Sequence, residues 1–180
     1  TRTATITINA NPSITAFSDS PACVGEDITL TSSPSGGTMP YAFAWTGPSS
    51  YTAAIEDPAT IASATTAMAG TYNVTVTDFN GCTATATTAV VVNTPPTITM
   101  GSNPTVCAGS STASILYTAT TGSPTTYSID YDATAEAAGF VDVASPTLLL
   151  NPITLPVPAN AAPGTYNAAI PETNANGCTG

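Results

Sequence analysis

The sequence predicts an all-β chain of two tandem β-sandwiches, and three observations support this. Short segments alternate apolar and polar residues with a period of two, which is typical of half-buried strands. Asn-Gly pairs follow such segments and predict tight hairpin turns. One motif also occurs twice, as Ala-Gly-Thr-Tyr-Asn-Val-Thr-Val-Thr-Asp-Phe-Asn-Gly-Cys at 69–82 and as Pro-Gly-Thr-Tyr-Asn-Ala-Ala-Ile at 163–170, followed by Asn-Gly-Cys at 176–178. A chain of 180 residues has room for two small domains.

The first copy of the motif predicts the best-defined hairpin. Tyr72, Val74 and Val76 alternate with polar residues, so one face of this strand is apolar. The turn follows at Asn80-Gly81, and residues 83–92 form the return strand.

The rest of the chain supplies further strands around these hairpins. Residues 13–18, 27–32 and 41–46 are expected strands of the first module, and Tyr41, Phe43 and Trp45 share its inward face. Segment 51–67 fits short strands and loops. In the second module, Pro171 interrupts the strand that starts at 165, which indicates an edge or a bulge. The other expected elements there are strands at 97–100, 114–119, 126–131, 148–150 and 153–157, and a helical turn at 134–138 closed by Gly139.

Charge and composition exclude several classes of function. The formal net charge is −10 and Arg2 is the only basic residue, so nucleic acid is not an expected partner. Histidine and lysine are absent, which removes the commonest general base and any Schiff-base nucleophile, and no enzyme is expected. No apolar run reaches the length of a membrane span, so membrane insertion is not expected.

The four cysteines are expected to form structural disulfides in an oxidising, extracellular compartment. They are Cys23, Cys82, Cys107 and Cys178, with two in each module. Their parallel placement favours pairing within modules, Cys23 with Cys82 and Cys107 with Cys178. Pairing between neighbours and free buried thiols are the alternatives, because a regular sandwich places the two positions of each module at opposite ends.

The N-terminal residues 1–9 read as a last strand without its own sandwich. They alternate cleanly and match residues 83–93, the return strand of the first module. The second module has no such strand after Cys178 within this sequence. We therefore divide the chain into a donated strand at 1–9, a first sandwich at 10–94 and a second at 95–180. Thr3, Thr5, Ile6 and Ile8 are the expected inter-repeat strand residues.

Two kinds of ligand are weaker candidates. Asp78, Asp130 and Asp132 supply the carboxylate oxygens that calcium prefers, although no complete calcium loop is present. Tyr41, Phe43, Trp45 and Tyr51 would form an aromatic platform for a surface glycan, whereas core packing is the competing interpretation of the same residues.

The sequence also resembles a known class of repeats. Residues 23–30 (Cys-Val-Gly-Glu-Asp-Ile-Thr-Leu), Pro40-Tyr41, residues 45–48 (Trp-Thr-Gly-Pro) and the motif at 69–82 resemble PKD-like or immunoglobulin-like repeats. Such repeats occur in giant cell-surface proteins of Bacteroidota, including gliding-motility adhesins. The resemblance implies immunoglobulin-like sandwiches, secretion to the bacterial surface by the type IX route, and a stalk or filament role.

The expected function is thus a structural repeat of a long extracellular filament or adhesin stalk. Neighbouring copies of the repeat are its expected partners, head to tail, either within one covalent array or by strand donation. A carbohydrate-binding module and a strand-exchanged pilin subunit are the alternative hypotheses.

Overall fold

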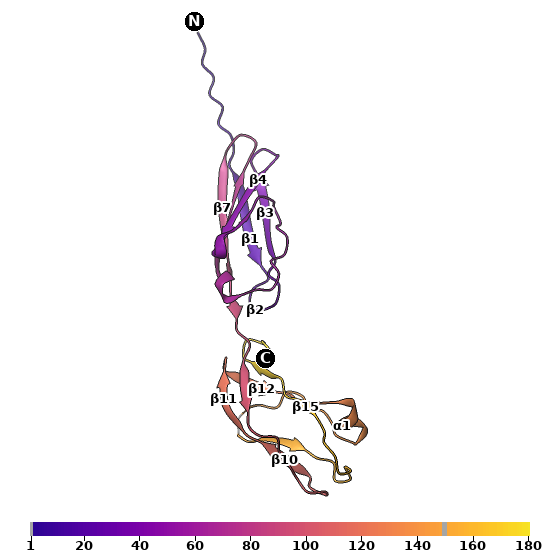
Figure 1. Ribbon diagram of the computed structural model, residues 1–180. Helices are drawn as coiled ribbons and strands as arrows, with labels where there is room; N and C mark the ends of the chain where they lie inside the picture. Colours follow the sequence, from indigo (N-terminus) through magenta and orange to yellow (C-terminus); the bar gives the residue numbers. More distant parts are fainter. Residues whose placement is uncertain (1, 149–150) are drawn as a thin grey trace. The chain divides into compact units, whose positions relative to one another are not determined.

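The computed structural model describes residues 2–148 and 151–180. The chain divides into two compact units, Thr1–Asn93 and Thr94–Gly180, and each is described here by itself (Figure 1). We call them unit 1 and unit 2.

Unit 1 is a β-sandwich. One layer is a four-stranded antiparallel sheet, and the facing layer is the antiparallel pair β1 and β3. A short parallel pair, β2 and β8, closes one end. The sheet runs in the order β5 (Tyr51–Ala53), β4 (Ala42–Gly47), β6 (Gly70–Thr77) and β7 (Thr83–Val90); the other strands are β1 (Pro12–Ser18), β2 (Ala22–Cys23), β3 (Leu30–Gly36) and β8 (Val92–Asn93), and two 3-10 turns, η1 (Pro48–Ser50) and η2 (Thr66–Met68), lie between β4 and β6.

The predicted hairpin of unit 1 is confirmed in its register. Strands β6 and β7 pair along their whole length, from Gly70 opposite Val90 to Thr77 opposite Thr83. The predicted strand at 27–32 begins later, because β3 starts at Leu30. Ile28 instead exchanges two backbone hydrogen bonds of 2.9 Å with Ile61, so the ambiguous segment 51–67 supplies a bridge as well as β5.

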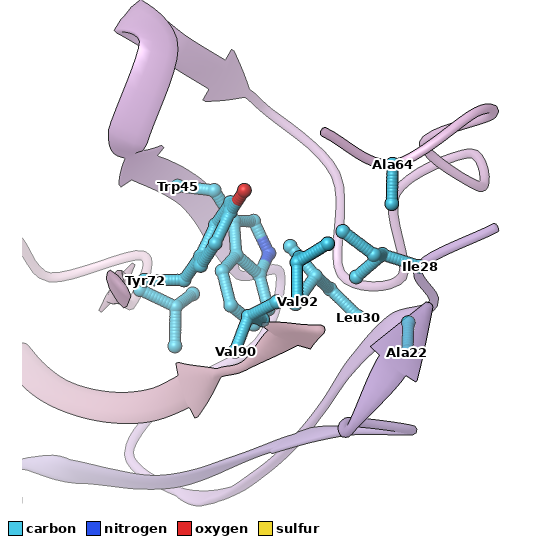
Figure 2. Packing of buried hydrophobic residues seen from close by; sticks show 9 residues of the cluster. Ala22, Ile28, Leu30, Trp45, Ala64, Tyr72, Val90 and Val92 are labelled. Atoms are coloured by element: carbon cyan, nitrogen blue, oxygen red, sulfur yellow. The ribbon is translucent and has the colours of Figure 1, made fainter. Parts of the chain in front are cut away.

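The core of unit 1 surrounds Trp45, which is buried as predicted. Its indole Nε1 donates to the Glu56 carbonyl at 3.2 Å, so the polar atom of the ring is satisfied inside the fold. Figure 2 shows Val90 and Val92, from the end of β7 and from β8, reaching the indole ring and the side chain of Leu30. These two valines close the core from the side of the last strands.

The described residues of unit 2 form four antiparallel strand pairs and one short helix. The helix, α1 (Ala133–Ala137), begins at Asp132, whose carboxylate accepts from the Ala135 amide, and a glycine at positive φ follows it at Gly139, as predicted. The pairs are β9 (Thr97–Met100) with β11 (Tyr117–Thr121), β10 (Thr112–Ile115) with β14 (Ile153–Pro156), β12 (Pro124–Tyr127) with β16 (Glu172–Asn174), and β13 (Asp130–Tyr131) with β15 (Ala168–Ala169).

Proline 171 explains why one predicted strand of unit 2 is divided. The segment from 165 forms β15 and β16 on either side of Pro171, which has no N–H to donate, and the Pro171 carbonyl accepts from Ser128 N at 2.9 Å. Residues 165–167 are not strand. The expected strand at 148–150 lies largely outside the described residues.

Candidate functional site

The turn of the β6–β7 hairpin is organised by Asp78, one of the calcium candidates. Its Oδ1 accepts from the amides of Asn80 and Cys82 at 3.0 and 2.8 Å. Its Oδ2 accepts from the Thr38 amide at 3.0 Å. The buried carboxylate therefore satisfies three backbone donors, and its role in the structure is to fix the turn.

The same turn recurs in unit 2 around Asn174. The Asn174 Oδ1 accepts from the amides of Asn176 and Cys178 at 3.0 and 3.1 Å. The Asn174 amide donates to the Cys178 carbonyl at 3.0 Å, as Asp78 N does to Cys82 O at 2.9 Å. Thr173 and Thr179 then form a bridge that corresponds to the pair Thr77 and Thr83. Unit 2 therefore carries the first step of a return strand next to β16.

The two other calcium candidates lie near α1. Asp132 caps the helix through Ala135 N at 2.8 Å and accepts from the Asn167 side chain at 2.9 Å. The Ala135 amide and the Asn167 side chain hold the pKa of Asp132 below its usual value. Asp130 lies in β13 next to this cap. Within the described residues, no three carboxylate, histidine or cysteine side chains are arranged to hold a metal ion.

The cysteines differ from the expected pairing. Cys23 and Cys178 are disulfide-bonded, whereas Cys82 and Cys107 are free thiols. The prediction of Cys23 with Cys82 and of Cys107 with Cys178 is therefore wrong. The reason is strand length: Cys23 pairs with Asn93, and the twelve residues from Cys82 to Asn93 are mainly extended, so Cys23 and Cys82 lie roughly 30 Å apart. A disulfide needs Cα atoms within about 7 Å.

The aromatic residues of the predicted platform are buried or half-buried: Trp45 is buried, and Tyr41, Phe43 and Tyr51 are half-buried. Tyr41 and Phe43 meet edge-to-face with centroids 6.4 Å apart, and Tyr51 and Tyr72 do so at 5.3 Å. Burial raises the pKa of both Tyr51 and Tyr72. Because Trp45 is buried, the core-packing interpretation of this predicted platform is correct.

The N-terminal segment, residues 2–9, is exposed along its whole length and forms no strand with the described residues of this chain (Figure 1). Thr3 and Thr5 are exposed, and so are Ile6 and Ile8, at 85% and 91%. Pairing of this segment with a neighbouring copy stays a prediction. Two isoleucines in water are unfavourable, so the segment is suited to burial against another surface.

Unit 2 contains an apolar groove. Its volume is about 680 Å³. The loop 103–109 and the segment 161–168 both line it. The apolar side chains lining it include Val106, Ala113, Ile115, Leu155, Val157 and Tyr166.

Sequence reasoning did not identify the loop at Val106 as part of a site. The signal was present, since residues 105–109 (Thr-Val-Cys-Ala-Gly) match residues 21–25 (Pro-Ala-Cys-Val-Gly). Both loops also form the same turn: Glu26 N donates to Cys23 O at 3.0 Å, and Ser110 N to Cys107 O at 3.1 Å. A residue-by-residue comparison of the two modules would have identified this loop as a counterpart of the loop that pairs with the last strand of unit 1.

Comparison with known proteins places the fold but gives no family. No family model matches the chain, and no curated protein matches it. Among solved structures, the chain is similar over 94% of its length to a structure of a 1.5-MDa bacterial ice-binding adhesin, with 16% identity, 62% of that chain covered and a TM-score of 0.50. It also matches fibronectin(III)-like modules of Clostridium thermocellum CbhA (14% identity, 91% of this chain and 88% of that one, TM-score 0.47) and DIP-gamma IG1+IG2 (12%, 95% and 94%, 0.43).

At this level of identity the likeness concerns the fold. The chain is an all-β protein with the fold of immunoglobulin-like sandwich domains in tandem. The finer expectation, a PKD-like repeat of Bacteroidota adhesins, is not established by these matches. Among the described residues no helix is long and apolar enough to cross a membrane.

Proposed function

We propose that the chain is a non-enzymatic structural repeat of a long extracellular filament or adhesin stalk, which polymerises head to tail. One observation carries the proposal: residues 2–9 repeat the pattern of the strand that closes unit 1, yet lie exposed. A strand with an apolar face and no sheet is a means of joining one repeat to the next.

The disulfide supports the extracellular part of the proposal. Cys23 and Cys178 are disulfide-bonded, and such bonds persist in secreted and surface proteins. A chain with one basic residue also offers almost no cleavage sites to trypsin-like proteases, which suits an exposed stalk. Surface attachment on a bacterium, type IX secretion and a part in gliding motility belong to the same proposal and rest on the sequence resemblance.

The test is to isolate the native assembly from the cell surface, denature and reduce it, and measure its mass. One very long polypeptide indicates a covalent array. A species of about 18 kDa, the mass of this chain, indicates separate subunits joined by strand exchange, as in a pilin. Electron microscopy must show filaments in either case, and recovery of the chain only as an intracellular monomer would refute the proposal.

A carbohydrate-binding module is the competing class. The buried position of Trp45 removes the aromatic platform on which that hypothesis rested. Binding of the chain to a polysaccharide array, abolished by substitution of an exposed aromatic residue such as Phe79, would favour that hypothesis over a purely structural stalk.

A further inference from the structure

We propose that the groove of unit 2 binds residues 2–9 of a second copy of this chain as an added β-strand. Ile6 then takes the place that Val90 has in unit 1, and Ile8 that of Val92. The proposal rests on the head-to-tail function above. It names the residues at the joint, the contact between residues 2–9 of one copy and unit 2 of the next.

The sequence match fixes the register. Residues 6–9 (Ile-Thr-Ile-Asn) correspond to 90–93 (Val-Val-Val-Asn), and Pro12 and Ile14 then correspond to Pro96 and Ile98 at the same spacing of 84 residues. In unit 1 the two valines are 2% and 9% exposed, while Ile6 and Ile8 are 85% and 91% exposed. The two isoleucines and the two valines thus have matching sequence positions and spacing. They differ in that only the valines are packed in a core.

The groove provides the surroundings that Val90 and Val92 have in unit 1. There the valines pack with Ile28, Leu30 and Tyr72 (Figure 2). In unit 2, Ala113 and Ile115 are the buried residues of β10, and they line the groove together with Tyr166, the counterpart of Tyr72 in the repeated motif. The groove is therefore the position of a final strand that the described residues of unit 2 do not fill.

The exposure of Val106 also indicates that a strand is missing next to the groove of unit 2. Ala22 pairs in β2 opposite Val92 and is 5% exposed. Its counterpart Val106 is 47% exposed and lies in a loop without strand pairing. A strand seated in the groove would cover Val106 and convert this loop into a short parallel pair like β2 with β8.

The backbone of unit 1 predicts the hydrogen bonds of the joint. Ala22 N donates to Val91 O at 3.0 Å, and Val24 N donates to Asn93 O at 2.9 Å. By the same register, the amides of Val106 and Ala108 donate to the carbonyls of Thr7 and Asn9 of the second copy. Thr3, Thr5 and Thr7 then face outward, as Thr87, Ala89 and Val91 do in unit 1.

Charge also favours this occupant. The segment carries Arg2, the only basic residue of the chain. The charged side chains of unit 2 are all negative: Asp130, Asp132, Glu136, Asp142 and Glu172. Attraction between Arg2 and these carboxylates favours association and predicts weaker binding at high salt.

The first experiment measures binding of a fluorescein-labelled peptide, Thr-Arg-Thr-Ala-Thr-Ile-Thr-Ile-Asn, to the full chain by fluorescence anisotropy. The chain used carries Ile6→Asp and Ile8→Asp, so its own segment cannot compete. We expect saturable binding, and a loss of at least about tenfold when Ile6 or Ile8 of the peptide is replaced by Asp. Thr5→Asp and Thr7→Asp peptides are matched controls, because Asp lowers strand propensity equally at an outward position, and they should stay within about threefold.

The second experiment changes the groove. Val106→Asp in the same chain should weaken peptide binding by at least about tenfold without unfolding unit 2, because Val106 is half exposed in the free chain. Val141→Asp is the control, since Val141 is exposed and outside the groove. Hydrogen exchange followed by NMR should show the amides of Val106 and Ala108 slowed at least about tenfold by saturating peptide, with the Phe79 amide of unit 1 unchanged.

These results separate the inference from the proposed function. No saturable binding at about 100 µM peptide, or equal binding of the Ile6→Asp and Thr7→Asp peptides, overturns the inference even if filaments are seen on cells. Specific binding with protection of the Val106 amide supports the joint even if the native chain proves not to be part of a stalk.

Discussion

Gly47, at the end of β4, lies directly against the ring of Tyr72: a Cβ built on Gly47 would be 2.4 Å from Tyr72 Cδ1. Tyr72 cannot yield easily, because its hydroxyl donates to Met68 O at 3.0 Å and its ring meets Tyr51. We expect Gly47→Ala to destabilise unit 1 by about 2 kcal/mol through overpacking.

Urea unfolding followed by the fluorescence of Trp45, the only tryptophan of the chain, measures this in unit 1 alone. Gly81→Ala is the control, since Gly81 has a φ of +83° and no neighbour within 4 Å of a Cβ. Its cost of about 1 kcal/mol comes from the backbone only. Equal effects of the two substitutions would contradict the role of the Tyr72 contact.

Loss of the Asp78 carboxylate should weaken unit 1. Asp78→Ala leaves the amides of Thr38, Asn80 and Cys82 without their acceptor, and we expect a loss of about 3 kcal/mol in unfolding free energy. Glu56→Ala, at an exposed side chain of the same unit, should change it by less than about 0.5 kcal/mol. Trp45 fluorescence in urea is again the measurement. If added calcium stabilised the wild type but not the Ala variant, the carboxylate would be a calcium ligand rather than only the acceptor of the turn.

Thiol counting tests the cysteine arrangement. The unreduced chain, unfolded in guanidinium chloride, should react with two equivalents of Ellman's reagent, at Cys82 and Cys107. Mass mapping of alkylated peptides identifies the positions, and Cys82→Ser should lower the count by one without a change in stability. A count of zero would restore pairing within modules.

The cap of α1 predicts a pH dependence of unit 2. The pKa of Asp132 is lowered in the folded state by the Ala135 amide and the Asn167 side chain. Its stabilisation is therefore present above its unfolded pKa of about 4 and is lost as pH falls through the folded value. Asp132→Asn keeps an oxygen for the Ala135 amide and cannot titrate.

The stability difference between the wild type and Asp132→Asn should accordingly be constant above about pH 5 and shrink in acid. Unfolding of unit 2 can be followed by its tyrosine near-ultraviolet circular dichroism. A difference that stays constant down to pH 2 would show that the carboxylate's charge does not contribute.

Alkaline pH should act on unit 1 through Tyr72. Burial raises the pKa of Tyr72, so the stability that depends on its neutral hydroxyl is full below the unfolded pKa of about 10 and falls as pH rises through the folded value. Between about pH 9 and 12, stability measured by Trp45 fluorescence should fall less steeply in Tyr72→Phe than in the wild type. If the stability of the wild type and of Tyr72→Phe fell equally with pH, ionisation of Tyr72 would not contribute.

Local pattern was enough to predict much of unit 1. The period of two around Tyr72, the Asn80-Gly81 turn and the inward position of Trp45 depend on neighbours in the chain, and the structure has all three. Prediction was poorer in unit 2, where Pro171 divides a strand and the pairs are short. Short pairs depend on which segments meet in space, and that information is not local.

The cysteines and the groove show what the sequence determines and what depends on the tertiary structure. Repetition along the chain determines that there are two β-modules, that each carries two cysteines, and that residues 2–9 resemble a closing strand, because period and turn chemistry act over a few residues. Which sulfurs are bonded, and that Val106 borders an open core, depend on three-dimensional separation. The length of β7 carries Cys82 away from Cys23, and covering Val106 requires a strand that its own unit, as described, does not supply.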